Sequence, residues 1–136
     1  MTRSSKFVVF GLVVGALAWC DSAAQAQAMA TGGLTVDANL AKRGKTVWNN
    51  RGCAACHTIG KGRVAGPDLA GVTERRSIEW LKRWLKAPEQ MYESDSIAKQ
   101  LLDEAKGIKM PNLKLSDADI DAVIHYVVQE GQKKKG

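Results

Sequence analysis

The motif Cys53-Ala54-Ala55-Cys56-His57 constrains this chain more than any other feature of its sequence. C-x-x-C-H is the pattern that attaches a c-type haem. Two thiols three positions apart on a helix-like turn lie on one face, where both can form thioether bonds with the vinyl groups of one porphyrin. The histidine after the second thiol then lies beneath the iron as its proximal ligand. The sequence therefore predicts one covalent haem c, held by Cys53 and Cys56, with His57 on the iron.

Other uses of the paired cysteines fit the sequence less well. A structural zinc site usually has four protein ligands, and the mature chain offers only the three motif residues and His125, with Cys56 and His57 adjacent. A thioredoxin-like pair needs a surrounding β-α-β pattern, which the sequence lacks. In an exported protein the two thiols would usually form a disulfide. His57 instead argues that both sulfurs hold haem.

The first 28 residues predict a secretory signal peptide. Arg3 and Lys6 form a basic start, the charge-free apolar run 7–19 follows, and an Ala-x-Ala cleavage site ends the segment. An uncleaved anchor is the alternative, although the run is shorter than the about 20 residues that a spanning helix needs. We assign Cys20 to the discarded segment. Export predicts a periplasmic protein with no stable membrane insertion after cleavage.

The charge of the chain indicates what kind of partner it meets. Its formal net charge is +6, and a moderately basic carrier is suited to acidic protein surfaces. The basic residues are scattered along the sequence, and the expected compartment holds no nucleic acid, so we expect redox proteins as partners and no nucleic acid. A monomer is the default expectation.

Hydrophobic periodicity predicts an all-α fold of four or five short helices around one covalently bound haem. No segment alternates like a strand, and residues 58–72 have the glycine-rich composition of a loop. Gly44 costs about 1 kcal/mol inside a helix, which close approach of another helix would explain. The expected helices are about 37–50 (capped by Asp37), 77–87 (capped by Ser77, stopped by Pro88), 96–105 and 116–131 (capped by Ser116, stopped by Gly131).

These segments define the expected domain organisation. The signal peptide, 1–28, precedes a short glycine-containing segment at 29–36 that we expect to be flexible. One haem domain follows over 37–131, and residues 132–136 form a basic tail. With so few aromatic residues, 6% of the chain, the short helices would have difficulty filling a core without a buried porphyrin.

The sixth ligand of the iron decides whether such a haem binds gases, reacts with peroxide or carries electrons. Met110 lies in a short loop stiffened by Pro111, where a thioether can be held against iron. The alternative is a loop methionine that fills a gap in the core. The other candidates are Met91, His125 and several lysines. Met91 lies in a polar neighbourhood typical of a surface or packing residue, and helical rotation turns His125 outward as a solvated histidine. We therefore expect Met110 as the second axial ligand.

Four features together resemble a small soluble class I cytochrome c. They are the motif at 53–57, Gly66-Pro67-Asp68-Leu69, Met110-Pro111-Asn112-Leu113 and the capped last helix, and the resemblance covers roughly 40–129. It implies a haem c held by Cys53 and Cys56, with His57 and Met110 as axial ligands.

The resemblance also implies two structural contacts. The carbonyl of Pro67 would accept a hydrogen bond from the proximal imidazole N–H, which fixes the ring and raises its basicity. The first and last helices would cross tightly where Gly44, Trp48 and Tyr126 match the glycine and aromatic contact of the family. The segment between Pro67 and Met110 is longer than the family pattern and holds two tryptophans on one helix.

Trp80 and Trp84 share a helix face four residues apart. Core packing explains both, yet a buried indole N–H needs an acceptor, and a haem propionate is the obvious one. We therefore include both among the cofactor-binding residues. Arg75, Arg76 and Arg83 are further candidates for the propionates, although a solvated charged face explains each.

The leading interpretation is a periplasmic one-electron carrier, not an enzyme, that cycles its iron between the ferric and ferrous states. The alternative is a haem subunit, or a gas- or peroxide-reactive haem protein, with a labile sixth ligand. For a carrier, the exposed haem edge would lie near the two cysteines. Lys61, Arg63, Lys109 and Lys114 are the candidate charges around that edge.

Overall fold

The computed structural model describes residues 33–134, and over that range it contains six α-helices, one 3₁₀ turn and no strand. The predicted all-α class is confirmed. The predicted signal peptide and Cys20 lie outside the described residues. Within 33–134, no helix combines the length and apolar composition that crossing a membrane requires.

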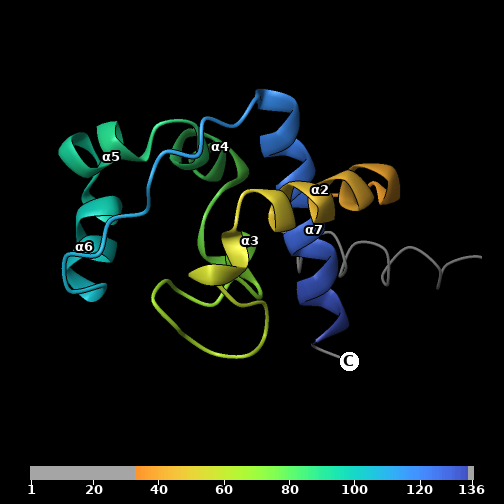
Figure 1. Cartoon of the computed structure of the whole chain (residues 1–136), viewed down its shortest axis with the longest axis horizontal. Helices are drawn as coiled ribbons and strands as arrows, with labels where there is room; N and C mark the ends of the chain where they lie inside the picture. Colours follow the sequence, from red (N-terminus) through yellow and green to blue (C-terminus); the bar gives the residue numbers. More distant parts are fainter. Residues whose placement is uncertain (1–32, 135–136) are drawn as a thin grey trace, which may run out of the picture.

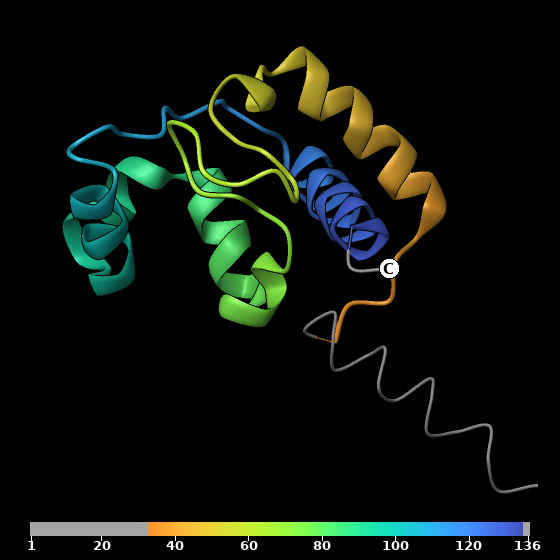
Figure 2. The same ribbon diagram turned by 90° about the horizontal axis from the view of Figure 1, so that it is seen from below.

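Helices α2 (Ala38–Asn50) and α7 (Asp117–Lys133) cross and form the largest helix contact of the fold (Figures 1 and 2). A Cβ on Gly44 would overlap the carbonyl oxygen of Ala122 and lie 2.7 Å from Cβ of Tyr126. The rings of Trp48 and Tyr126 pack beside this point, 5.8 Å apart. The expected tight crossing at Gly44 is therefore confirmed, since only a residue without a side chain fits there.

Helices α4 (Ile78–Lys86) and α5 (Pro88–Ser94) follow one another almost without a break. Ser77 caps α4 as expected, its hydroxyl oxygen accepting from the N–H of Trp80 at 3.2 Å. Pro88 ends α4 but also begins α5, a helix that the sequence did not predict. Proline suits the first position of a helix because its missing N–H has no partner there in any case. The four-residue helix α3 (Val72–Arg75) is likewise an element that the sequence did not predict.

Helix α6 (Ser96–Glu104) agrees with the expected third helix and is capped by the Asp95 carboxylate, which accepts from the N–H of Ala98 at 2.9 Å. Ser116 caps α7 by accepting from the N–H of Asp119 at 3.1 Å. The expected stop at Gly131 is wrong, because α7 continues to Lys133. Gly131 is buried inside the helix, where an added Cβ would lie 3.4 Å from Cα of Ala70. Packing against this loop explains the glycine.

Two groups of elements face one another across the centre of the molecule. The crossed helices α2 and α7 and the turn η1 (Cys53–Ala55) lie on one side, and α5 and α6 lie on the other (Figure 1). Helix α4 lies between them, and a long loop runs from the turn to α3. Side chains from each of the described helices and from the turn line a cavity between them.

Candidate haem-binding site

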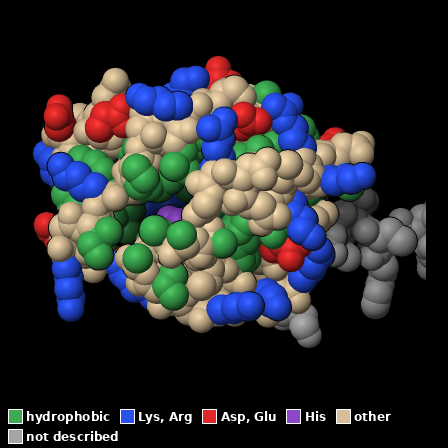
Figure 3. Space-filling view, in the orientation of Figure 1, with side chains coloured by type: hydrophobic (Ala, Val, Ile, Leu, Met, Phe, Trp, Pro, Cys, Tyr) green, Lys and Arg blue, Asp and Glu red, His purple; other side chains and the backbone are tan. Residues whose placement is uncertain are grey.

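A largely apolar cavity of about 280 Å³ lies between the turn η1, helix α4 and the segment before α7. Figure 3 looks into a hollow in which a histidine is visible, with hydrophobic side chains and several Lys or Arg side chains around it. Every residue predicted to bind haem lines the cavity: Cys53, Cys56, His57, Pro67, Trp80, Trp84 and Met110.

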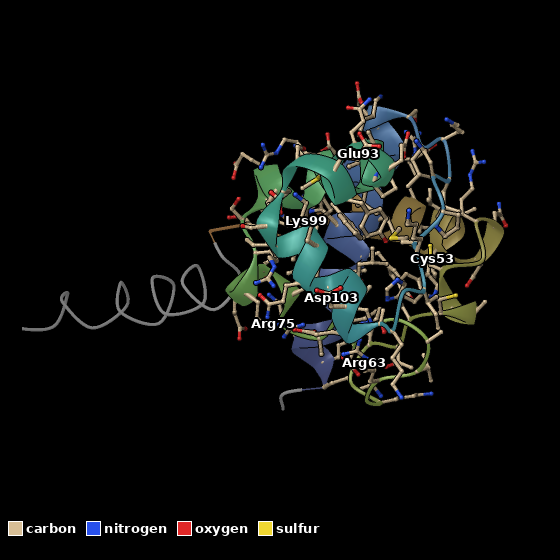
Figure 4. All side chains as sticks on the ribbon, turned by 90° about the vertical axis from the view of Figure 1, so that its left-hand side faces the viewer. Cys53, Arg63, Arg75, Glu93, Lys99 and Asp103 are labelled. Atoms are coloured by element: carbon tan, nitrogen blue, oxygen red, sulfur yellow. The ribbon has the colours of Figure 1, made fainter. Side chains whose placement is uncertain are left out.

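The turn η1 places the two cysteines at the edge of this cavity. Gly52 precedes the turn with φ +69, and the N–H groups of Cys56 and His57 both donate to the carbonyl of Cys53, at 3.2 and 2.9 Å. Cys53, labelled in Figure 4, is half-buried, and Cys56 is exposed. Burial raises the pKa of the Cys53 thiol. Both thiols are free, so both are available to a porphyrin.

The imidazole of His57 is held by a backbone carbonyl, as the resemblance implied. Its Nδ1 lies 2.9 Å from the oxygen of Pro67, and because a carbonyl only accepts, Nδ1 carries the proton. The other ring nitrogen, Nε2, is therefore the one left to bind a metal. A Cβ on Gly66 would lie 2.5 Å from Cε1 of His57 and 2.9 Å from the carbonyl oxygen of Cys56. Gly66 thus lets the loop close onto the ring, a role that the sequence did not predict.

Asp68 organises the loop that carries Pro67, and this role too was not predicted. Its carboxylate accepts hydrogen bonds from the backbone N–H groups of Gly60, Lys61, Gly62 and Ala70 at 2.6 to 2.9 Å, and from the hydroxyl of Thr58 at 2.7 Å.

Desolvation alone would raise the pKa of Asp68, but these hydrogen bonds outweigh it and hold the pKa well below its usual range. Arg75 fastens the same loop by donating to the carbonyl oxygens of Asp68 and Ala70 at 2.9 and 2.8 Å. The Gly66-Pro67-Asp68-Leu69 pattern was the available signal for this arrangement.

Met110 contacts two aromatic residues from other elements. The indole N–H of Trp84 on α4 donates to its sulfur at 3.2 Å. Its own backbone N–H donates to the hydroxyl oxygen of Tyr92 on α5 at 2.8 Å. Tyr92 also lines the cavity, and its role was not predicted because α5 was not.

Two of the other candidate ligands, Met91 and His125, lie away from the cavity, whereas Lys109, one of the candidate lysines, lines it. Met91 is buried, 7% exposed, in the core away from the cavity lining, which agrees with its interpretation as a packing residue. His125 does not line the cavity either. It is half-buried, and its Nδ1 accepts from the N–H of Asp37 at 3.0 Å. The ring points away from the cavity as expected, but it is only partly solvated because it joins α7 to the start of α2.

The two tryptophans form a stacked wall of the cavity, with ring centroids 5.3 Å apart and planes inclined by 12°. The indole N–H of Trp80 donates to the Asp95 carboxylate at 3.1 Å, and that of Trp84 to Met110. Both donors thus have acceptors within the protein, so core packing rather than a propionate accounts for them here.

Of the three arginines predicted as possible partners of the propionates, two line the cavity and one does not. Arg75 and Arg76 line the cavity, together with Arg51 and Lys109, but the guanidinium of Arg75 is already bonded to the carbonyls of Asp68 and Ala70. Arg76 also lies over the ring of Trp80, 5.7 Å from its centroid. Arg83 lines a separate groove between α4, α5 and α7 and does not face the cavity.

The donor set fits a covalent haem. An apolar cavity presents two free thiols at its edge, a histidine whose Nδ1 is already bonded, and a thioether held by two aromatic residues. Imidazole and thioether are a familiar axial pair for haem iron. Arginine and lysine side chains at the lining would balance the charge that propionates bring.

The cytochrome c family model matches residues 41–130 of this sequence. The chain belongs to the cytochrome c family. It is thus an electron-transfer haem protein that carries covalent haem c with iron, and the predicted resemblance to a small class I cytochrome c is confirmed.

Solved structures agree with this assignment. Cytochrome c from Rhodothermus marinus superposes with a TM-score of 0.67 at 28% identity, covering 79% of this chain and 97% of that one. An engineered form of the same cytochrome c gives a TM-score of 0.66 at 29% identity, covering 78% and 97%.

Among curated proteins, the chain is similar to a nitric oxide reductase subunit of Stutzerimonas stutzeri. The two are 31% identical over an alignment of 91 residues that covers 62% of this chain. The match spans 54% of that relative, so the cytochrome c domain is similar to about half of it.

Proposed function

We propose that this cytochrome c is an exported, monomeric carrier of one electron, with a single haem whose iron is bound by His57 and Met110. The observation that carries the proposal is that one apolar cavity is lined by both side chains and by both thiols of the attachment motif. Met91 and His125 do not line it, and of the lysines in the described residues, which were also candidates, Lys109 alone does.

The haem supplies an iron that gains and loses one electron. The protein's part is to keep the iron's surroundings the same in both states. The Pro67 carbonyl fixes the imidazole plane of His57 and raises the basicity of its free nitrogen. Met110 supplies a thioether, which favours the ferrous state and raises the reduction potential. The stacked Trp80 and Trp84 give the cavity an apolar wall.

The rim of the cavity supports a protein partner with an acidic face. Lys61, Arg63, Lys109 and Lys114, the four predicted rim cations, are all exposed. Lys109 also lines the cavity, and its Nζ lies 5.7 Å from the centre of the Tyr92 ring. Because such attraction is screened by salt, we expect electron transfer with an acidic redox protein to slow as ionic strength rises. We propose no nucleic acid as a partner.

Two variants of the purified exported protein test the axial ligands. Wild type should show the sulfur-to-iron charge-transfer band in the ferric state and a reversible one-electron titration. Met110→Ala should lose the band, whereas the matched change Met91→Ala should keep it because Met91 packs away from the cavity. A band that survives in Met110→Ala would exclude Met110 as the ligand.

The similarity to a nitric oxide reductase subunit favours a second candidate, a haem subunit of a larger electron-transfer complex. Purification of the tagged chain from its own cells distinguishes the two. A carrier elutes alone at the size of one chain, and a subunit elutes with its complex. Carbon monoxide tests the remaining alternative, since prompt binding to the reduced protein would show an open or labile sixth position.

A further inference from the structure

Met110 is held by two donor–acceptor contacts that come from different helices. Trp84 on α4 donates its indole N–H to the sulfur at 3.2 Å, and the Tyr92 hydroxyl on α5 accepts the backbone N–H of Met110 at 2.8 Å. The contact partners are 26 and 18 residues away in sequence, so only the tertiary structure brings them together. The first contact reaches the atom that would bind the iron.

The direction of the Trp84 N–H is imposed by its neighbours. One face of its ring stacks on Trp80 at 5.3 Å, with the planes inclined by 12°. The Tyr92 ring meets it edge-on, 5.1 Å away and inclined by 79°. Trp80 directs its own N–H to the Asp95 carboxylate, at 3.1 Å. Packing within the aromatic cluster therefore directs the indole N–H of Trp80 to the Asp95 carboxylate and that of Trp84 to the Met110 sulfur.

We infer that Trp84 is a positioning residue that acts through Met110 on the reduction potential, an inference that rests on the proposed His57 and Met110 ligation. A thioether sulfur is a weak hydrogen-bond acceptor. The N–H takes up one lone pair of the sulfur and leaves the other for the iron. By drawing electron density from the sulfur, it weakens donation to the ferric state more than to the ferrous state. Trp84 therefore raises the potential.

The test compares Trp84→Phe with Trp80→Phe. Both variants remove one indole N–H from the same stack, but only the first removes a donor to sulfur. Against a fixed redox couple, Trp84→Phe should lower the ferrous-to-ferric ratio by about threefold to tenfold, which is about 30 to 59 mV at 59 mV per tenfold. Trp80→Phe also changes the cavity wall but leaves the donor to sulfur in place, so it should lower the ratio by a smaller factor than Trp84→Phe does.

The charge-transfer band separates this inference from the proposed ligation. If wild type lacks the band, the ligand assignment fails and the role of Trp84 with it. If wild type has the band and the two variants share one potential, the role of Trp84 alone is wrong. Loss of the band in Trp84→Phe, with retention in Trp80→Phe, would support the positioning of the sulfur.

A second measurement applies if Trp84→Phe takes up no haem. In Met110→Ala, the indole N–H of Trp84 should exchange with solvent at least about tenfold faster than in wild type, since it has lost its acceptor. The indole N–H of Trp80, bonded to Asp95, should keep its wild-type rate. Equal acceleration at both indoles, or none at either, would overturn the inference.

Discussion

The two sides of the haem cavity are built in different ways. On the histidine side, the bond from His57 to Pro67 spans 10 residues, and all the side-chain hydrogen bonds of Asp68 lie within the segment 58–70. On the methionine side, Met110 depends on Trp84 and Tyr92, which are 26 and 18 residues away on α4 and α5.

This difference indicates which side is the more easily altered. A loop closed by many short-range bonds loses little chain entropy when it forms, and its bonds support one another. A single residue held by two contacts from separate helices depends on how those helices pack. We therefore expect the histidine side to determine stability and haem uptake, and the methionine side to tune the electronic properties of the iron.

The largest expected effect comes from Gly66→Ala on the histidine side. The new Cβ would lie 2.5 Å from the His57 ring and 2.9 Å from the Cys56 carbonyl oxygen, so the loop must move away from the ring. We expect the free energy of unfolding to fall by about 3 kcal/mol, measured by denaturant titration of the holoprotein. In Gly131→Ala, the nearest atom lies at 3.4 Å. This control should leave stability unchanged or raise it by up to about 1 kcal/mol.

Asp68→Asn should have the next largest effect, on the order of 2 kcal/mol at neutral pH. In the wild type, both carboxylate oxygens of Asp68 accept hydrogen bonds from backbone N–H groups. In the variant, one of these oxygens is replaced by an NH₂ group, which can only donate. The N–H groups that bonded to that oxygen would then face another donor. The exposed change Asp103→Asn on α6 is the matched control and should have little effect.

The same variant has a pH signature. The pKa of Asp68 in the folded protein lies below its unfolded value of 3.8. The carboxylate therefore stabilises the fold above pH 3.8, and this contribution to the free energy of unfolding is lost as the pH falls. The stability gap between wild type and Asp68→Asn should therefore narrow between about pH 5 and pH 2. A gap that stays constant over this range would contradict the role assigned to the carboxylate.

Tyr92→Phe tests the methionine side at a smaller scale. The ring keeps its edge contact with Trp84, but the Met110 N–H loses its acceptor. We expect a loss of about 1 kcal/mol in unfolding free energy, with the charge-transfer band retained. A loss as large as that of Gly66→Ala would show that the two sides contribute equally to stability.

The smallest effect is expected where the two sides meet at the surface. Arg63 on the long loop pairs with Glu104 at the end of α6 at 3.6 Å, and both side chains are 43% exposed (Figure 4 labels Arg63). Exposed pairs contribute little, so Arg63→Gln should change stability by less than about 0.5 kcal/mol, and by less still at high salt. A larger loss would show that this ion pair fastens the long loop to α6.

Much of the fold was predictable because its signals are local. Ser77 and Ser116 cap the helices expected of them, and Gly44 lies at the predicted crossing. The errors in the predicted helix boundaries came at residue types that can either end a helix or belong to one. Pro88 begins α5 instead of only ending α4, and Gly131 lies inside α7 because a loop packs against it.

The sequence by itself determined the attachment motif, the identity of His57 and Met110 as candidate ligands, and the Pro67 contact that the resemblance implied. These follow from the spacing of neighbouring residues, which the backbone turns into geometry within a few positions. Only the tertiary structure decided that Trp84 and Tyr92 hold Met110, that Asp68 gathers the long loop, and that His125 joins α7 to α2. In each of these contacts, the packing of the helices and loops decides which donor meets which acceptor. The periodicity of the sequence carries no information about that pairing.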